Sequence, residues 1–246
     1  TLKRMSDRIA HRGPDDSGMY FSPDGRAGLG FRRLAIIDLS PTGHQPMTNE
    51  DGRLWIVFNG EIYNYPDLRK ELARAGHEFR STSDTEVVIH GYEEWGAGVL
   101  SRLRGMFAFA LWDERNHALF AARDRLGIKP LHYYWDGERF AFASEIKALL
   151  TLPRLKTDLD HSAIWDYFTY LYVPTQKTVY KFIRKLPPAH YLTFRITGGA
   201  DSPVRPFGEP ESSPLQIKQY WDVTRWGNST LSRADAADAV REKLRE

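Results

Sequence analysis

Apolar positions along this chain of 246 residues follow two spacings, one typical of helices and one typical of strands. The helical spacing predicts helices over 1–10, 67–75, 86–95, 145–150 and 161–171, and a last helix that begins after Ser232. Apolar and β-branched runs predict strands over 19–21, 29–39, 54–58, 106–112, 118–122, 132–135, 139–142 and 191–196. The run 106–112 does not alternate, as expected for a strand covered on both faces, and a hairpin is predicted to turn at Asp136-Gly137. Ser144 and Asp160 are the predicted caps of the helices that follow them. Many strands between two groups of helices favour two stacked sheets with helices outside them.

A segment rich in Gly, Pro and Ser separates the last predicted strand from the last predicted helix. It runs over 197–214 and is typical of a linker. Its Thr197-Gly-Gly-Ala-Asp-Ser202 sequence is similar to a phosphate-binding loop, but such a loop must open a helix, and the prolines that follow forbid one. We therefore expect one domain over 1–196, and over 197–246 a linker with the first helix of a truncated further domain.

The apolar strand 54–58 leads directly into Asn59-Gly60-Glu61, which brings together a side-chain amide, an unhindered backbone N–H and a carboxylate. Asn-Gly is also the favoured two-residue hairpin turn. A hairpin would continue into a second alternating strand, whereas residues 61–66 lead within a few positions into a predicted helix. An oxyanion hole needs two convergent donors, and Asn59 with Gly60 supplies both, each donor being worth about 10²–10³ in rate.

Three charged residues are candidates for holding the two charged ends of an amino acid. Arg33 lies in an apolar strand and suits a bidentate clamp on a carboxylate, although a surface arginine at a sheet edge is the alternative. Its neighbour Arg32 must face the opposite side of the strand. Glu61 and Asp84 could share an ammonium group, although Asp84 taken alone is also a typical helix cap.

Composition excludes several classes of protein. The net charge is +2 with acids and bases interspersed, which argues against a nucleic-acid or membrane-surface partner. No apolar run approaches the ~20 residues of a membrane span, and we expect a cytoplasmic protein. No metal site is expected, because the eight histidines lack His-x-x-x-His spacing and the chain has no cysteine. Thr1 begins a helix, so an N-terminal threonine nucleophile is not expected either.

Seven short motifs follow one another along the chain, and together they carry a family resemblance. They are His11-Arg-Gly-Pro-Asp15, Arg33-Leu-Ala-Ile-Ile37, Phe58-Asn-Gly-Glu-Ile-Tyr-Asn64, Ser83-Asp-Thr-Glu86, Gly105-Met-Phe-Ala-Phe109, Ala122-Arg-Asp-Arg-Leu-Gly127 and Ala143-Ser-Glu145. In this order they resemble the class-II glutamine amidotransferase domain of glutamine-hydrolysing asparagine synthetase. Further segments narrow the resemblance to the asparagine synthetase branch: Tyr172-Val-Pro174, Lys185-Leu-Pro-Pro188, His190-Tyr-Leu192 and Tyr220-Trp-Asp222. The resemblance covers nearly the whole chain.

The resemblance implies an N-terminal-nucleophile hydrolase fold. This is an α+β fold, a four-layer αββα sandwich of two mainly antiparallel sheets, here with its first strand missing. In the family, a mature N-terminal Cys attacks the side-chain amide of glutamine while its own α-amine acts as the base. Ammonia leaves as a thioester intermediate forms.

The resemblance also assigns roles to residues of this chain by their match to the motifs. Arg33 would hold the α-carboxylate of L-glutamine, with help from the backbone of Ile36 and Ile37. Asn59 and Gly60 would form the oxyanion hole. Glu61 and Asp84 would together take the α-ammonium group, and no residue is assigned to a metal.

The chain departs from the family at both ends. The strand that bears the nucleophilic Cys is expected upstream of Thr1, and the synthetase domain, with its ATP and Mg²⁺, is expected beyond Glu246. The chain as given is therefore expected neither to hydrolyse glutamine by this route nor to make asparagine, and the missing strand leaves a sheet edge unpaired. Expected partners are L-glutamine and the chain's own C-terminal synthetase domain, with a homodimer as a further assembly, and no cofactor is expected within the chain.

Three alternatives stay open. A non-catalytic, structural amidotransferase-like domain, as in asparagine-synthetase-like cyclases, fits the absence of cysteine but does not require the retained Arg33, Asn59, Glu61 and Asp84. An amidotransferase that feeds ammonia to a sugar phosphate or to phosphoribosyl pyrophosphate does not account for the Lys-Leu-Pro-Pro and Tyr-Trp-Asp segments. Amidation of a carboxylate other than aspartate is compatible with every residue of the chain.

Overall fold

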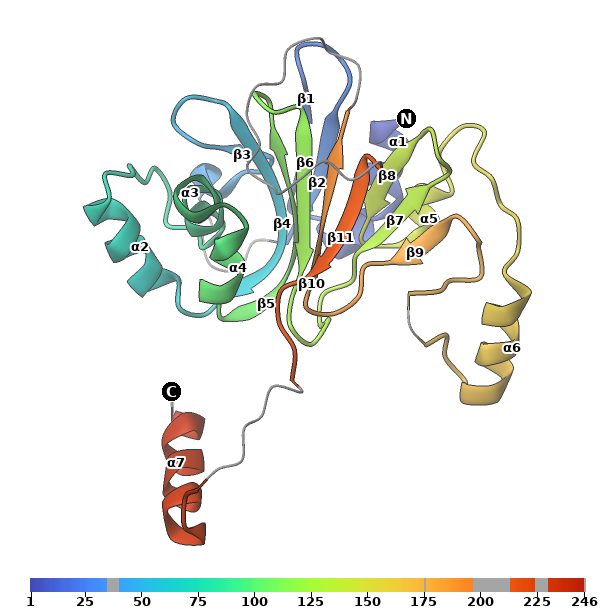
Figure 1. Cartoon of the computed structure of the whole chain (residues 1–246). Coiled ribbons are helices and arrows are strands. Elements are labelled where there is room, and N and C mark those ends of the chain that lie inside the picture. The colour runs from blue at the N-terminus through green and yellow to red at the C-terminus, as the bar shows by residue number, and fades with distance from the viewer. Residues whose placement is uncertain (35–39, 175, 197–212, 224–229, 246) are drawn as a thin grey trace.

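The computed structural model describes residues 1–34, 40–174, 176–196, 213–223 and 230–245. Its largest sheet has six strands in the order β11-β10-β6-β5-β4-β3, and every neighbouring pair is antiparallel (Figure 1). These strands are β3 (Met47–Thr48), β4 (Leu54–Ile62), β5 (Gly105–Asp113), β6 (Ala118–Arg123), β10 (His190–Arg195) and β11 (Leu215–Gln219). β4 and β5 pair along their whole length.

A second layer of strands packs on one face of the six-stranded sheet. It contains the hairpin of β1 (Asp16–Phe21) and β2 (Gly28–Arg33), and a sheet in the order β8-β7-β9 with β7 (His132–Trp135), β8 (Phe140–Ala143) and β9 (Ile183–Lys185). Alternate residues of the large sheet face this layer, as the two-residue period of a strand requires. The shared core includes Val57, Ala108, Ala110, Trp112, Leu119 and Ala121 from the large sheet, with Leu29, Leu131 and Tyr133 opposite them.

Helices cover the other face of the large sheet. They are α2 (Tyr65–Arg74), α3 (Thr85–Trp95) and α4 (Val99–Arg102), at the left in Figure 1. The intervening residues of the same strands face these helices and form a separate core, with Ile56, Phe58, Phe107, Phe109 and Phe120 packed against Leu72, Val87, Val88 and Leu100. β4 and β5 are therefore buried on both faces, which explains why their apolar residues do not alternate with polar ones.

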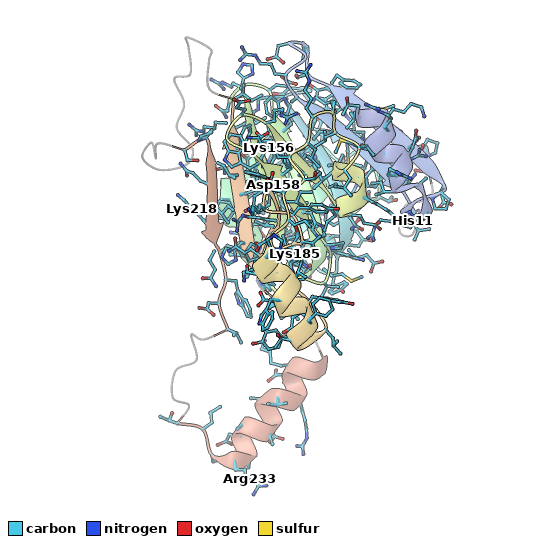
Figure 2. The ribbon with its side chains drawn as sticks, turned by 90° about the vertical axis from the view of Figure 1, so that its right-hand side faces the viewer. His11, Lys156, Asp158, Lys185, Lys218 and Arg233 are labelled. Carbon is cyan, nitrogen blue, oxygen red and sulfur yellow. The ribbon has the colours of Figure 1, made fainter. Side chains whose placement is uncertain are left out.

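The described residues also form a fourth layer and two peripheral helices. α1 (Leu2–Arg8) and α5 (Ile146–Leu149) pack against the second layer of strands, where Met5 joins a core around Tyr134 and Leu149. α6 (His161–Tyr170) and α7 (Arg233–Arg245) lie outside the layers (Figure 1), and Figure 2 shows Arg233, the first residue of α7, well away from the sheets. Among the described residues, each helix is too short or too polar to span a bilayer.

The predicted four-layer α+β sandwich is confirmed. The non-alternating run 106–112 lies within β5, and the hairpin predicted around Asp136-Gly137 joins β7 to β8. Asp160 caps α6 as expected, because its side chain accepts the N–H groups of Ser162 and Ala163.

Several predicted boundaries were wrong. The strand predicted over 29–39 ends at Arg33 in the structure, and residues 35–39 lie outside the described part of the chain. α5 is preceded by Glu145 rather than capped by Ser144. β11 was not predicted; it lies within the range assigned to a linker and a further domain, yet it pairs with β10. Such a short edge strand, with exposed Lys218 and Gln219, carries little apolar pattern.

Candidate functional site

One edge of β4 carries the first hydrogen-bond donor of the site. Along an antiparallel strand, alternate N–H groups point to opposite edges. The N–H of Phe58 donates to Gln45 Oε1 at 2.7 Å and that of Ile62 donates to Asp84 Oδ2 at 2.8 Å, so both point away from β5. Gly60 lies midway between these residues, and its N–H therefore points to the same edge, between the side chains of Gln45 and Asp84.

Asn59 supplies a second donor beside the first. It shares a face of β4 with Val57, which packs against the second layer of strands. Its Nδ2 is buried and has no hydrogen-bond partner among the described residues. Leaving a buried donor unsatisfied costs about 1–3 kcal/mol, so an amide held in this state points to a ligand that accepts the bond.

The close pairing of β4 and β5 explains why position 60 is glycine. A Cβ atom on Gly60 would lie 2.2 Å from the carbonyl oxygen of Met106 and 2.7 Å from the Cα of Phe107. Both are backbone atoms of β5, and they cannot move without disrupting the ladder. Asn59, Gly60 and Glu61 thus lie inside a strand that runs to Ile62, and not beyond a strand end at Phe58 or in a hairpin turn.

Arg33 is buried at the end of β2, with 9% of its surface exposed. Its Nη1 donates to the carbonyl oxygen of Ser40 at 3.1 Å. The guanidinium of Arg32 instead pairs with Asp7 of α1 at 2.5 Å. The two arginines have separate partners, as the alternation of side chains along a strand predicts.

Asp84 and Glu61 form a pair of carboxylates with an unfavourable charge interaction. Burial raises the pKa of Asp84, the N–H of Ile62 opposes that shift, and the negative charge of Glu61 raises the pKa further. Although Asp84 directly precedes α3, its side chain makes no capping hydrogen bond to the described helix; the Ser83 hydroxyl accepts the N–H of Thr85 instead. A buried Asp84 beside a half-buried Glu61 favours a cationic ligand, which would relieve the repulsion.

A cavity of about 840 Å³ connects these groups. Its lining includes Arg33, Asn59, Gly60, Glu61 and Asp84, and it continues between β2 and β8, whose residues 28–33 and 140–143 also line it. Among the described residues, β2 pairs only with β1 and β8 pairs only with β7. The cavity therefore has a polar end at β4 and a slot bordered by two unpaired strand edges.

The structure brings together most of the site residues expected from the sequence. Ile36 and Ile37 lie outside the described residues. Sequence reasoning missed Gln45, which is 6% exposed. Its side chain links the edge of β4 to α3, since its Oε1 accepts the N–H of Phe58 and its Nε2 donates to Thr85 Oγ1 at 3.2 Å. The only local signal was a polar residue in a Gly-His-Gln-Pro loop, and nothing in that pattern distinguishes a buried glutamine from an exposed one.

A family model described as a glutamine amidotransferase domain matches residues 1–203. The chain belongs to this family. The resemblance drawn from the seven motifs is therefore confirmed, and the cavity at β4 lies within a glutamine amidotransferase domain.

Curated relatives of this amidotransferase domain include several asparagine synthetases. It is 42% identical over 226 residues to glutamine-hydrolyzing asparagine synthetase 3 of Bacillus subtilis, covering 91% of this chain and 34% of that protein. The identity to asparagine synthetase 1 of the same organism is 40% over 218 residues, covering 89% and 34%. Amidase chry2 of Gibberella zeae is 37% identical over 248 residues, covering 100% and 34%. The chain spans about a third of the length of these relatives.

Among solved structures, the amidotransferase domain is similar to glutamine phosphoribosylpyrophosphate amidotransferase from Bacillus subtilis complexed with ADP and GMP. The TM-score is 0.59 at 17% identity, covering 89% of this chain and 46% of that one. Identity this low shows a common fold alone. The shared fold agrees with the four-layer α+β sandwich expected from the sequence.

Proposed function

We propose that this amidotransferase domain binds L-glutamine in the cavity at β4 and, within an asparagine synthetase, releases ammonia from its side-chain amide. The observation that carries the proposal is the meeting of two unlike groups in one cavity. The Asn59 amide and the Gly60 N–H are donors for an oxyanion, and beside them Glu61 and Asp84 are acceptors for an ammonium group. Arg33, in the same lining, supplies the cation for a carboxylate.

In this proposal, the chain's own residues fix glutamine at both charged ends. Arg33 binds the α-carboxylate, with further donors from the backbone of Ile36 and Ile37. Glu61 and Asp84 bind the α-ammonium group, whose positive charge opposes the effect of burial and of the Glu61 charge, both of which raise the pKa of Asp84. With both ends held, the side-chain carbonyl is restricted to few orientations, and such positioning lowers the entropic part of the barrier.

The reaction then needs a thiolate, which attacks the amide carbon while the electron pair of the C=O bond moves to oxygen. Asn59 Nδ2 and the Gly60 N–H stabilise that oxyanion. When the intermediate collapses, the C–N bond breaks, the nitrogen takes the proton that the α-amine of the nucleophile accepted from the thiol, and ammonia leaves a thioester behind. Water hydrolyses the thioester to glutamate and restores the thiol. The chain has no cysteine, so we propose that a Cys-bearing strand pairs in the slot between β2 and β8.

The acceptor of the ammonia is proposed to be aspartate, activated with ATP and Mg²⁺ in a synthetase domain of the parent protein. Identities of 40% and 42% to asparagine synthetases support this acceptor. The 37% identity to Amidase chry2 supports a second candidate, in which the parent protein amidates another carboxylate. A domain that serves only as scaffold is the third candidate, and it fits the absence of cysteine.

Calorimetry tests the glutamine site. L-Glutamine is titrated into the chain and into a form with a Cys-bearing strand, its thiol replaced by Ala, added upstream of Thr1. We expect saturable binding to the second form, and a 10- to 100-fold loss in Arg33→Ala, as is typical for loss of a charge-assisted contact of about 1.5–3 kcal/mol. Arg74→Ala on the exposed face of α2 is the matched control.

Two results would contradict the glutamine site: equal affinities of the Arg33 and Arg74 variants, and a lack of binding to the strand-containing form. The second of these is the result expected of a scaffold. The acceptor is tested separately in the complete parent protein, which is given glutamine, ATP, Mg²⁺ and aspartate. Asparagine formation supports the synthetase assignment, and glutamine hydrolysis that is not coupled to aspartate supports another carboxylate.

A further inference from the structure

A cluster of titratable side chains lies on and around α3, outside the lining of the cavity at β4. It is made of Glu50, His77, His90 and Glu93, which together could hold a metal ion. Glu50 follows β3, His77 lies between α2 and α3, and the other two belong to α3. Figure 1 shows α2 and α3 on one face of the large sheet, near its edge strand β3. One atom from each of the four side chains lies within 4.8 Å of each of the others.

His90 is the buried centre of this cluster. It is 1% exposed, and neither of its ring nitrogens has a hydrogen-bond partner among the described residues. Nδ1 lies 3.6 Å from Glu50 Oε2 and 3.8 Å from Glu93 Oε2. Glu93 Oε2 is itself buried without a hydrogen bond and lies 3.7 Å from His77 Nδ1. Buried polar atoms are nearly always satisfied, so this convergence of unsatisfied atoms points to an absent bonding partner.

The other polar atoms of the same side chains are held by an outer set of contacts. Glu93 Oε1 accepts from Asn49 Nδ2 at 3.3 Å and from Arg53 at 3.5 Å. Glu50 Oε1 accepts the backbone N–H of Glu78 at 3.0 Å. These contacts orient each carboxylate so that its second oxygen faces the centre.

The histidines have carboxylates behind them in the same way. His77 Nε2 lies 3.3 Å from Glu94 Oε2, and His90 Nε2 lies 3.8 Å from Glu86 Oε1. A carboxylate behind the outer nitrogen is the usual support of a metal-binding imidazole, because it fixes the ring and its tautomer. Each of the four side chains thus directs one atom inward. The outer atoms of His77, Glu50 and Glu93 have hydrogen-bond partners, and the outer nitrogen of His90 faces the Glu86 carboxylate without a hydrogen bond.

We propose that Glu50, His77, His90 and Glu93 bind a divalent transition-metal ion, with Zn²⁺ as the best match. Two imidazole nitrogens and two carboxylate oxygens are typical ligands of this ion, whereas Ca²⁺ and Mg²⁺ prefer oxygen alone. Tetrahedral ligands at about 2.0–2.1 Å from Zn²⁺ lie roughly 3.3 Å apart. Three of the six separations between ligand atoms are 3.6–3.8 Å and all lie within 4.8 Å, so binding an ion requires the four side chains to move closer together.

The expectation from sequence spacing that the chain has no metal site was drawn from local patterns only. His90 and Glu93 are three residues apart on one helix, but His77 and Glu50 come from two other segments. Four side chains satisfy the ion, which is typical of a structural rather than a catalytic site. A bound ion would tie α3 to the segments around residues 50 and 77, and α3 begins next to Asp84 of the proposed glutamine site.

The test uses the full chain after treatment with a chelator. Titration with ZnCl₂ in a calorimeter is expected to give one ion per chain, and the melting temperature is expected to rise with Zn²⁺ concentration, because an ion that binds only the folded state stabilises it. Titration with Co²⁺ should give the strong visible absorption of a four-coordinate complex.

Variants assign the binding to the cluster. His77→Ala and the isosteric Glu93→Gln each remove one ligand and should lower the affinity for Zn²⁺ by more than about tenfold. His161→Ala, an exposed histidine at the start of α6, is the matched control and should leave the affinity unchanged. Melting curves of the chelator-treated variants show whether each one folds. One folded ligand variant is sufficient to assign Zn²⁺ binding to the cluster.

Three results would overturn the proposal. The first is the absence of binding heat and of any Zn²⁺-dependent rise in the melting temperature of the parent chain. The second is binding that persists with unchanged affinity in both ligand variants. The third is a chelator-treated protein that does not bind Zn²⁺ but is destabilised by Glu93→Gln. In that case the cluster would be an ion-pair network in which a protonated His90 pairs with the glutamates.

Discussion

α3 and α6 are helices of similar length with opposite surroundings. α3 has eleven residues, of which eight are buried, including the polar Glu86 and His90. α6 has ten residues, of which only Ala163 is buried, and it exposes Trp165 at 75% and Phe168 at 76%. The apolar stripe that predicts each helix is therefore not a guide to burial. The helix with the more polar sequence is the buried one, and its Glu86 carboxylate accepts the backbone N–H groups of Arg80 and Ser81.

The acidic residues that precede the two helices show the same contrast. Asp160 accepts the N–H groups of Ser162 and Ala163 within its own helix. Asp84 instead accepts the N–H of Ile62 on β4, far along the chain. The position of Asp160 is explained by the capping bonds to its own helix, whereas Asp84 makes no such bond to α3. The second is the one that lines a cavity with another carboxylate.

The largest difference between the helices is expected from truncation of apolar side chains. Ile89→Ala on α3 removes a side chain that is fully buried, and such changes cost about 2–5 kcal/mol of unfolding free energy. Urea denaturation monitored by circular dichroism measures this loss. A cost below about 1 kcal/mol would mean that α3 is not packed in the core as described.

The next largest effect is expected from the buried carboxylate of α3. Burial alone would raise the pKa of Glu86, but the nearby His90 and the N–H groups of Arg80 and Ser81 outweigh it and lower the pKa from 4.5 to about 2. The stabilising contribution is therefore complete above pH 4.5 and is lost as the pH falls through about 2. Glu86→Gln should cost about 1–3 kcal/mol at pH 7.

Denaturation across the acid range checks this prediction. The free-energy difference between the parent chain and Glu86→Gln should shrink as the pH is lowered, with chelator present throughout so that metal binding does not contribute. A difference that stays constant or grows toward low pH would contradict the assigned direction of the pKa shift.

A smaller effect is expected at the cap of α6. Asp160→Ala removes the acceptor of two backbone N–H groups and should cost about 1 kcal/mol. Thermal denaturation measures it, with Asp160→Asn as the control that retains an acceptor. If the Ala and Asn variants have the same melting temperature at neutral pH, the capping hydrogen bonds do not stabilise the protein.

The smallest effect is expected on the exposed face of α6. Trp165→Ala should change the unfolding free energy by no more than about 0.5 kcal/mol, because the side chain is already 75% exposed. The same denaturation experiment applies, and Ile89→Ala serves as its buried counterpart. A cost comparable to that of the buried residue would show that Trp165 is covered in the folded protein.

Local sequence patterns predicted the helices and strands well where the residues of a segment alone determine its secondary structure. The non-alternating run of β5 and the Asp136-Gly137 turn were identified because periodicity and turn chemistry act over a few residues. Asn59, Gly60 and Glu61 were identified as candidates because they are adjacent in sequence. Their roles in binding stay predictions until glutamine binding is measured.

The remaining features could not be predicted, because they depend on contacts between distant segments. Gln45 is a site residue only because β4 presents the N–H of Phe58 to it. β11 is a strand only because β10 offers a free edge. The cluster of Glu50, His77, His90 and Glu93 joins three segments whose meeting depends on the whole fold. No spacing rule applied to one segment finds such a set.

The alternation along β4 makes the proposed oxyanion hole depend on strand register. Inserting one residue after Ile56 would shift the rest of β4 by one position. The N–H of Gly60 would then point toward β5, and the side chain of Asn59 would face the helices. Both donors would be lost by one change that alters neither residue. A pair of donors built this way tolerates substitutions around it more readily than any change in the length of its strand.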